Sequence, residues 1–477
     1  MVTFLFSSEL LVSLSILRSN TITSCCCFRF PRMMAGCKTF PIVCLQLYLH
    51  TRSMLRTCTR MASAACQHRV KSQMYAVESA CKSPFYFTLK DNVSPVSSGT
   101  SNAWPFLAQG GYAHSLCVTT SQRVQAARLQ KSMGKELTAM VPGIQVVKLL
   151  SYIPDNLHGS LQRGFLILDS QHHHDLQNKL EGLLRENQQD IQLCTYTEEE
   201  GRVWQSRWEV NGQVKEMDRS EVVAVNGPMP SPFVEILRGS AVYSSLQDVL
   251  SVLRESAKVI PEAEKLLKCM DLGNIPEKGS HPVIVIEGLD ATGKSTLTES
   301  LKQHLKATLL RSPPDSISRW RKTFDDETSL IKRAYYALSN YVAAVDIAKA
   351  SEVSPVIVDR FWHSTAAYAI ATEIGGNIQN LPDHHHVVYQ WPEDLLKPDL
   401  VILLTVSDEE RIHRIRKRGL QETQEEKELE ANSMFRQKVE EAYRRMENPG
   451  CVVIDAGASR EAVLKNTLSI IKRHCDI

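Results

Sequence analysis

Residues 283–305 contain a glycine-rich loop, Gly-Leu-Asp-Ala-Thr-Gly-Lys-Ser at 288–295, between an apolar run and a segment with helical spacing. The apolar run before the loop, Val-Ile-Val-Ile-Glu, is typical of a buried strand. A strand, a Gly-x-x-x-x-Gly-Lys-Ser loop and a helix, in that order, let backbone N–H groups surround phosphate oxygens at the helix N-terminus. The motif therefore restricts this part of the chain to an α/β domain with a parallel sheet.

The rest of 283–477 has the same alternation of apolar strands and helices. We expect strands at 283–287, 308–311, 356–359, 400–406 and 451–455, and helices at 294–305, 328–349, 362–372, 408–418, 429–446 and 460–473. Short buried strands joined by helices predict a parallel sheet that is covered on both faces.

Residues 113–270 have the pattern of a smaller α+β domain without a catalytic motif. A strand is expected at 164–169, a helix at 176–186, a hairpin turn at Asn211-Gly212 and one amphipathic helix over 246–267. Residues 79–112 are rich in Ser, Pro, Gly and Asn, so we expect a weakly ordered segment before this domain. Residues 271–282 have the composition of a linker to the α/β domain.

The N-terminal region carries a strongly asymmetric charge. Between Leu10 and Val77 there is no Asp or Glu, but there are nine Lys and Arg residues. A basic, acid-free leader is typical of a mitochondrial transit peptide, so we assign 1–78 to a leader that directs the chain to the matrix. Two alternatives stay open, a secretory signal around Phe4–Ile16 and an untargeted tail. Glu9 interrupts that apolar run, which is also too short to span a membrane.

The whole-chain composition argues against a nucleic-acid partner and against zinc sites or a disulfide framework. Net charge is only +2, so we expect no direct nucleic-acid partner. Eight of the thirteen cysteines lie in the first 81 residues, and the other five show no Cys-x-x-Cys spacing, so neither a zinc site nor a disulfide framework is predicted. The sequence leaves the oligomeric state open between a monomer and a homodimer.

Two segments supply candidate residues for phosphoryl chemistry. In the loop, Lys294 is placed to bridge the β- and γ-phosphates of ATP, and the Ser295 hydroxyl to bind Mg²⁺. The strand at 356–359 ends in Asp359-Arg360, which places a carboxylate for the Mg²⁺ shell beside a guanidinium that can bind an acceptor phosphate. The ATP-binding candidates are Gly288, Leu289, Asp290, Ala291, Thr292, Gly293, Lys294, Ser295 and Thr296.

Three segments of 282–477 resemble the thymidylate kinase family: the loop 287–296, Asp359-Arg360-Phe361-x-x-Ser364, and Lys-Pro-Asp-Leu-Val-Ile-Leu-Leu at 397–404. The resemblance implies a five-stranded P-loop core that transfers the γ-phosphate of ATP to a pyrimidine nucleoside monophosphate. It also implies that Asp290 approaches the acceptor sugar, that Arg360 binds the acceptor phosphate and that Asp359 acts through Mg²⁺.

The same resemblance assigns roles to a basic run before Gly419. Family members whose P-loop lacks an arginine use arginines of the lid for catalysis, and this loop has Ala291-Thr292. Arg414 and Arg416 are therefore the expected catalytic lid residues, and Arg418 is expected to stack on the adenine of ATP. Guanidinium groups there would stabilise the negative charge of a phosphoryl-transfer transition state.

The chain departs from the family where thymine is recognised. An aromatic ring and an arginine, four residues apart on the long helix, are replaced by Ala337 and Tyr341. Tyr335, Tyr336 or Tyr341 could supply another stacking surface, and Arg311, Arg319 and Arg321 are candidates for a further acceptor-side arginine.

With the leader and the extra domain, the chain resembles a mitochondrial branch of this family, and that resemblance implies phosphorylation of dUMP, dCMP, CMP and UMP. Three alternatives stay open. The first is a thymidylate kinase, and the second is a nucleotide-binding signalling protein that acts through 113–270. The third is a nucleoside kinase, in which Glu287 would be the base that activates a sugar hydroxyl.

Overall fold

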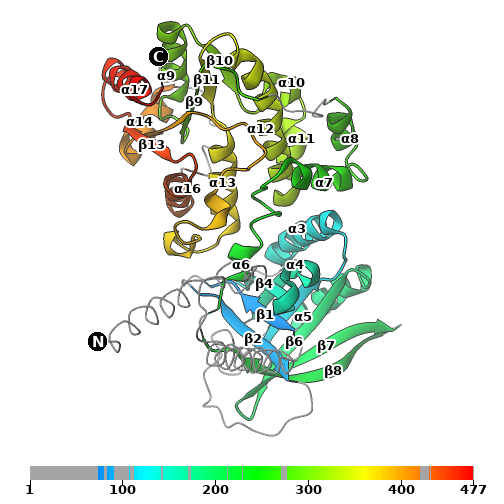
Figure 1. Ribbon diagram of the computed structural model, residues 1–477. Coiled ribbons are helices and arrows are strands. Elements are labelled where there is room, and N and C mark those ends of the chain that lie inside the picture. The colour runs from blue at the N-terminus through cyan, green and yellow to red at the C-terminus, as the bar shows by residue number, and fades with distance from the viewer. Residues whose placement is uncertain are drawn as a thin grey trace, which may run out of the picture. The chain divides into compact units, whose positions relative to one another are not determined.

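The computed structural model describes residues 73–79, 83–90, 107, 112–140, 143–169, 173–211, 213–227, 229–269, 277–418, 429 and 431–475 (Figure 1). Most of the predicted leader lies outside these residues. Within them, no helix is long and apolar enough to cross a lipid bilayer.

The α/β domain contains a five-stranded sheet in which every neighbouring pair is parallel. The strand order is β10 (Thr308–Arg311), β11 (Val356–Asp359), β9 (Val283–Gly288), β12 (Leu400–Thr405) and β13 (Cys451–Asp455). The predicted parallel sheet is confirmed, and all five strands lie within a residue of their predicted bounds. Because β9 is central, the glycine-rich loop leaves from the middle of the carboxyl edge.

Helices cover both faces of this sheet. Alternate side chains of β9 enter different apolar clusters: Val283 and Val285 belong to the cluster that contains residues of α12 (Ser329–Ser351) and α13 (Trp362–Glu373). Ile284 and Ile286 pack with α9 (Lys294–Leu305) and α17 (Arg460–His474). This alternation explains why the strands are apolar throughout, since neither face meets water.

Within its described residues, the α/β domain contains four further α-helices. They are α10 (Asp315–Ser318), α11 (Arg321–Asp325), α14 (Asp408–Arg418) and α16 (Ser433–Arg445). The start of α16 lies four residues after the predicted helix start, because Asn432 caps it by accepting a hydrogen bond from the Phe435 N–H at 2.9 Å.

The N-terminal domain contains a closed antiparallel barrel, with strand order β1-β2-β8-β7-β6-β3-β5-β4. Its strands are β1 (Met74–Val77), β2 (Phe85–Lys90), β3 (Tyr112–Val118), β4 (Gln145–Tyr152), β5 (Gln162–Asp169), β6 (Ile191–Glu199), β7 (Arg202–Asn211) and β8 (Gln213–Ala224). β7 and β8 form the hairpin predicted at Asn211-Gly212. β1 and β2 lie in 1–78 and 79–112, where the sequence predicted a leader and a weakly ordered segment. Both strands are short, and besides each other they pair with β4 and β8, which lie far along the chain, so local composition does not reveal them.

The two faces of β3 show how the barrel is filled and covered. Ala113 and Cys117 belong to an apolar cluster with Tyr75, Phe87 and Tyr196. Leu116 and Val118 belong to a second cluster that includes residues of α3 (Arg123–Met140) and α5 (His174–Glu186). A period of two along the strand therefore separates the barrel interior from the helix-covered outer face.

The short helix α4 (Leu157–Ser160) lies between β4 and β5 of the barrel. The segment after the barrel is helical and contains α6 (Pro232–Glu235), α7 (Leu246–Ser256) and α8 (Pro261–Lys268). The single helix predicted over 246–267 is wrong, because Ile260 is extended and Pro261 starts a new helix. Proline lacks the N–H that a continuous helix needs at that position.

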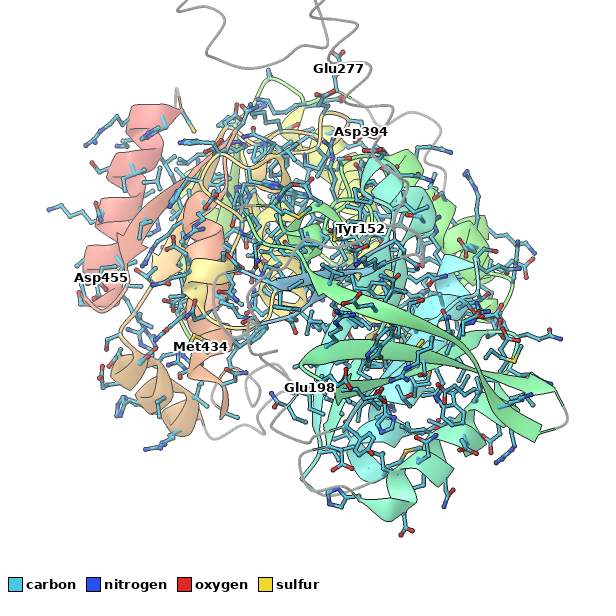
Figure 2. All side chains as sticks on the ribbon, turned by 90° about the horizontal axis from the view of Figure 1, so that it is seen from below. Tyr152, Glu198, Glu277, Asp394, Met434 and Asp455 are labelled. Atoms are coloured by element: carbon cyan, nitrogen blue, oxygen red, sulfur yellow. The ribbon has the colours of Figure 1, made fainter. Side chains whose placement is uncertain are left out.

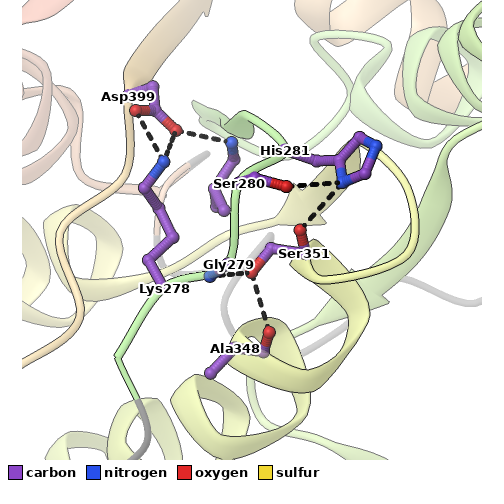
Figure 3. A network of polar contacts seen from close by, with 8 residues as sticks. Lys278, Gly279, Ser280, His281, Ala348, Ser351 and Asp399 are labelled. Atoms are coloured by element: carbon purple, nitrogen blue, oxygen red, sulfur yellow. Dashed lines mark hydrogen bonds and ion pairs between the residues drawn. The ribbon is translucent and has the colours of Figure 1, made fainter.

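Part of the predicted linker is fixed to the α/β domain by polar contacts (Figure 3). Lys278 forms an ion pair with Asp399 at 3.0 Å, and the Gly279 N–H donates to Ser351 Oγ at 2.8 Å. Asp399 also accepts from the Val283 N–H at 2.8 Å. These contacts fix the start of β9 at the edge of the sheet opposite to the glycine-rich loop.

Candidate active site

A cavity of about 1140 Å³ lies at the carboxyl ends of the five parallel strands. Its wall includes residues 290–297 of the loop and first turn of α9, the ends of β10 and β11, one face of α14 and residues 456–460 after β13. Loops at this edge are where ligands bind in open α/β sheets. Asp455, labelled in Figure 2, ends β13 and accepts a hydrogen bond from the Gly457 N–H at 2.8 Å.

The glycine-rich loop has the backbone that phosphate binding requires. Gly288 has φ 140°, and a Cβ there would lie 2.5 Å from the Leu404 carbonyl oxygen. Gly293 is the left-handed N-cap of α9. Of the predicted ATP-binding residues, Asp290 to Thr296 line the cavity, whereas Gly288 and the buried Leu289 are not among its lining residues.

Lys294 lies at the floor of this loop. It is 7% exposed, and its Nζ donates to the Leu289 carbonyl oxygen at 2.7 Å and lies 3.9 Å from Asp290 Oδ1. The ammonium group is thus held inside the loop by a carbonyl and a carboxylate, which an incoming phosphate can replace.

Arg360 meets the same carboxylate from the other side. Its Nη2 lies 2.5 Å from Asp290 Oδ1, and its Nη1 donates to Ser364 Oγ at 3.2 Å. The backbone of Arg360 is in the left-handed region, with φ 64°, which turns the chain sharply between β11 and α13. The structure therefore brings together Lys294, Asp290 and Arg360, three residues that the sequence selected.

The residues predicted to hold Mg²⁺ are suited to that ion. Asp359 and Ser295 both line the cavity. Oδ1 of Asp359 is buried and has no hydrogen-bond partner among the residues that the structure describes. A buried carboxylate oxygen without a partner is costly, and a hard cation or its water shell would satisfy it. The donor set, a carboxylate and a hydroxyl, fits Mg²⁺.

Glu287 is excluded from direct chemistry by its burial. It is 0% exposed and accepts hydrogen bonds from the Phe361 N–H at 2.9 Å and the Ser364 N–H at 3.2 Å. Burial raises the pKa of its carboxyl to about 7, against the opposing effects of the Ser364 hydroxyl and Arg360. A sugar hydroxyl cannot reach this carboxylate, which argues against a nucleoside kinase with Glu287 as base.

The three lid arginines lie in different environments. Arg414 lines the cavity and donates to the carbonyl oxygens of Thr292 at 3.2 Å and Ala456 at 2.7 Å. Arg416 is exposed and is not among the lining residues. The side chain of Arg418 is outside the described part of the structure. Arg414 is thus bound to the backbone of the loop that it was predicted to assist.

On the acceptor side, the structure separates the candidates that the sequence left open. Arg311 and Arg321 line the cavity, whereas Arg319 lies over the Trp320 ring at 4.0 Å. Of the three tyrosines, Tyr335 and Tyr341 are buried, and their hydroxyls donate to the Ile317 carbonyl at 3.0 Å and Asp394 at 2.6 Å. Tyr336 is half-buried and accepts from Arg321 Nε at 3.1 Å, so it alone of the three contacts a lining residue.

Sequence reasoning missed one wall of the cavity, residues 456–460. A signal was present: Ala456 and Gly457 follow the last predicted strand directly, and loops that follow parallel strands share one edge. Sequence reasoning also assigned Glu287 no role in holding Arg360. No local sequence pattern indicates that a glutamate at the end of one strand will form hydrogen bonds with the segment that follows the neighbouring strand.

The parallel sheet, its phosphate loop and a cavity shared by Lys294 and Arg360 define a P-loop kinase of the nucleoside monophosphate class. The chain belongs to the thymidylate kinase family, whose model matches residues 286–467.

Three known proteins illustrate the relationship. The human UMP-CMP kinase 2, mitochondrial, is 48% identical over 374 residues, which cover 76% of this chain and 83% of that protein. A probable thymidylate kinase of Saccharolobus solfataricus is 25% identical over 200 residues, 40% of this chain and 97% of that protein. The solved thymidylate kinase of Candida albicans is 20% identical and covers 40% of this chain and 92% of that one, with a TM-score of 0.33.

Proposed function

We propose that this protein is a mitochondrial kinase that transfers the γ-phosphate of ATP to dUMP, dCMP, CMP and UMP. One observation carries the proposal. Asp290 Oδ1 lies within 4 Å of both Lys294 Nζ and Arg360 Nη2, so a donor-side and an acceptor-side cation meet at one point of the cavity. A phosphoryl group that passes between two phosphates needs positive charge on both sides.

In this proposal the two cations have separate tasks. Lys294 binds the β- and γ-phosphates of ATP after leaving the Leu289 carbonyl, and Arg360 binds the acceptor phosphate after exchanging Asp290 for it. Asp290, once released, is free to accept from the acceptor sugar. Arg414 and Arg416 of the lid add positive charge near the equatorial oxygens as the site closes and excludes water. Mg²⁺, held by Ser295 and Asp359, would neutralise the charge that develops on the phosphates.

The proposed acceptor preference rests on the absence of the thymine-binding side chains from the long helix, α12. Ala337 replaces the expected ring, and Tyr341 replaces the expected arginine and is turned to Asp394. Thymine-reading groups are therefore missing where the family has them, which supports uracil and cytosine nucleotides. The name of the human relative, UMP-CMP kinase 2, mitochondrial, points the same way for both acceptor and compartment.

The test is a steady-state screen of ADP formation by the full chain with each common nucleoside monophosphate. We expect turnover with CMP, UMP, dCMP and dUMP and at least tenfold lower kcat/KM with dTMP, a difference of about 1.4 kcal/mol. Lys294→Ala should abolish turnover. Lys302→Ala, on the exposed face of the same helix and paired only to Glu299 at 3.5 Å, is the matched control and should leave it unchanged.

Two results would contradict the proposal. Higher kcat/KM with dTMP than with dUMP would make the protein a thymidylate kinase. ATP binding without phosphorylation of any monophosphate would favour a nucleotide-binding signalling protein instead. The compartment is tested separately, by fractionating cells that express the full chain with a C-terminal tag.

A further inference from the structure

Two neighbouring parallel strands, β9 and β11, end side by side and carry residues of opposite charge. Glu287 lies near the end of β9, and Arg360 follows the end of β11. Arg360 lines the cavity, whereas Glu287 is 0% exposed behind it. A carboxylate in such a position costs free energy unless its oxygens accept several hydrogen bonds.

All of the donors to Glu287 come from the loop and the first turn of α13. The N–H groups of Phe361 and Ser364 donate to Oε1, at 2.9 and 3.2 Å, and the Ser364 hydroxyl donates to Oε2. These are N–H groups at the N-terminus of a helix, which have no partner within the helix and favour a negative charge. Glu287 therefore fixes the start of α13 to the end of the central strand.

Ser364 connects Glu287 to Arg360 through its hydroxyl group. Its Oγ accepts from Arg360 Nη1 at 3.2 Å and pairs with the Tyr443 hydroxyl of α16 at 2.8 Å. Tyr443 is itself 0% exposed. Arg360 is consequently held at one nitrogen by a side chain that Glu287 orients, and its other nitrogen points to Asp290, where the acceptor phosphate is expected.

The backbone gives an independent reason for the same arrangement. Arg360 has φ 64°, a left-handed conformation that is unfavourable for a residue with a side chain. The hydrogen bonds that Glu287 accepts from the N–H groups of Phe361 and Ser364 hold the chain in that turn. Without them, both the guanidinium direction and the turn would relax.

We propose that Glu287 is a positioning residue for the acceptor phosphate, which sets the direction of Arg360 through Ser364 and the start of α13 without touching either substrate. The inference rests on the proposed acceptor role of Arg360. We expect the effect to be specific to the acceptor, because the hydrogen bonds that Glu287 accepts come from the start of α13, which follows Arg360.

The test compares Glu287→Gln with wild type. Glutamine keeps one oxygen for the two N–H groups, but its NH₂ group cannot accept from the Ser364 hydroxyl. By calorimetry on the full chain, we expect the Kd of CMP to rise roughly tenfold or more, as for a misplaced binding group, and the Kd of a non-hydrolysable ATP analogue to change less than twofold. Kinetically, the KM for CMP should rise and the KM for ATP should not.

Two further variants keep the inference falsifiable. Ser364→Ala should weaken CMP binding similarly even if Glu287→Gln fails to fold, and the double variant should be no weaker than the worse single one, because both act on one path. The control is Glu373→Gln. Glu373 lies at the other end of α13 and accepts from the Ser329 hydroxyl, so its replacement should change neither Kd.

Equal losses of CMP and ATP-analogue binding in Glu287→Gln would show a general structural role, and an unchanged CMP Kd in both variants would also overturn the inference. Failure of the proposed function is distinguishable, since there the wild type itself would bind no CMP.

Discussion

Arg414 is the residue for which the structural environment differs most from the role expected from the sequence. The family resemblance makes it a catalytic lid arginine, but its three nitrogens are already used. Nε donates to Glu410 at 2.6 Å, Nη1 to the Thr292 carbonyl at 3.2 Å and Nη2 to the Ala456 carbonyl at 2.7 Å. One side chain thus joins α14 to the phosphate loop and to the loop after β13.

The cost of removing it can be worked from these contacts. Hydrogen bonds from a charged donor contribute about 1.5–3 kcal/mol each. Arg414→Met removes the two to carbonyl oxygens and the ion pair with Glu410, which is partly exposed and adds little. Thr292 and Ala456 line the cavity, where water can replace the donor, and the Arg414 side chain is 26% exposed. Reducing the sum by about half gives a loss of about 2 kcal/mol. Arg414→Lys should recover less than half of that, because an ammonium group cannot match the fork of a guanidinium.

The assay is urea unfolding of the full chain, followed by the KM for ATP at saturating CMP. We expect Arg414→Met to lower stability and to raise the KM for ATP, since the Thr292 peptide that it holds belongs to the loop around the phosphates. Arg416→Met, on an exposed position of the same helix, is the control and should change stability by less than about 0.5 kcal/mol. Unchanged stability and unchanged KM with a lower kcat would refute this reasoning and leave Arg414 purely catalytic.

Three other outcomes follow from the structure. Gly288→Ala should destabilise the protein by about 3 kcal/mol in urea unfolding, because its φ is 140° and the new Cβ would meet the Leu404 carbonyl. Gly450→Ala should be tolerated, because its Cβ would only make an ordinary van der Waals contact with the Met446 carbonyl oxygen at 3.4 Å. Burial lowers the pKa of His363 to about 4 from 6.5, so its stabilising contribution is present above pH 6.5 and lost as the pH falls towards 4. Over this range the free energy of unfolding of the wild type should fall by about 3 kcal/mol, and this loss should be absent from His363→Gln. Equal pH profiles of the two proteins would contradict the prediction. Mapping of alkylated thiols by mass spectrometry should find the exposed Cys269 modified in the native protein, while Cys194, whose pKa burial raises to about 12, reacts only after unfolding.

The α/β domain could be predicted closely because its signals are local. The helix at 294–305 and the strands at 308–311, 356–359 and 451–455 match the structure residue for residue, since apolar runs and helical spacing act within one element. The candidate site followed from two motifs whose residues, Lys294 and Arg360, meet at the same sheet edge.

What the sequence could not supply depends on contacts between distant segments. Whether Tyr335 is a stacking surface or core depends on Phe324, whose ring lies parallel to it at 4.7 Å. The bonds of Arg414 depend on how α14 approaches two loops. The barrel strands β1 and β2 pair with each other, but their outer neighbours are β4 and β8, so the local sequence contains only part of the reason for their existence.

The strand order of the barrel also has a consequence for the time course of folding. Phe87 of β2 pairs with Ala224 of β8, and Met74 of β1 with Tyr152 of β4, so the first two strands acquire their outer neighbours only after long stretches of chain have become available. Closing such large loops precedes any gain from pairing, which makes non-local β structure slow to form. A chain that emerges N-terminus first, from a ribosome or through a translocation pore, would therefore leave the outer edge of β1 unpaired until β4 arrives and that of β2 unpaired until β8 arrives. We expect the barrel to be the late-folding part of this protein and the stage at which a chaperone has most to protect.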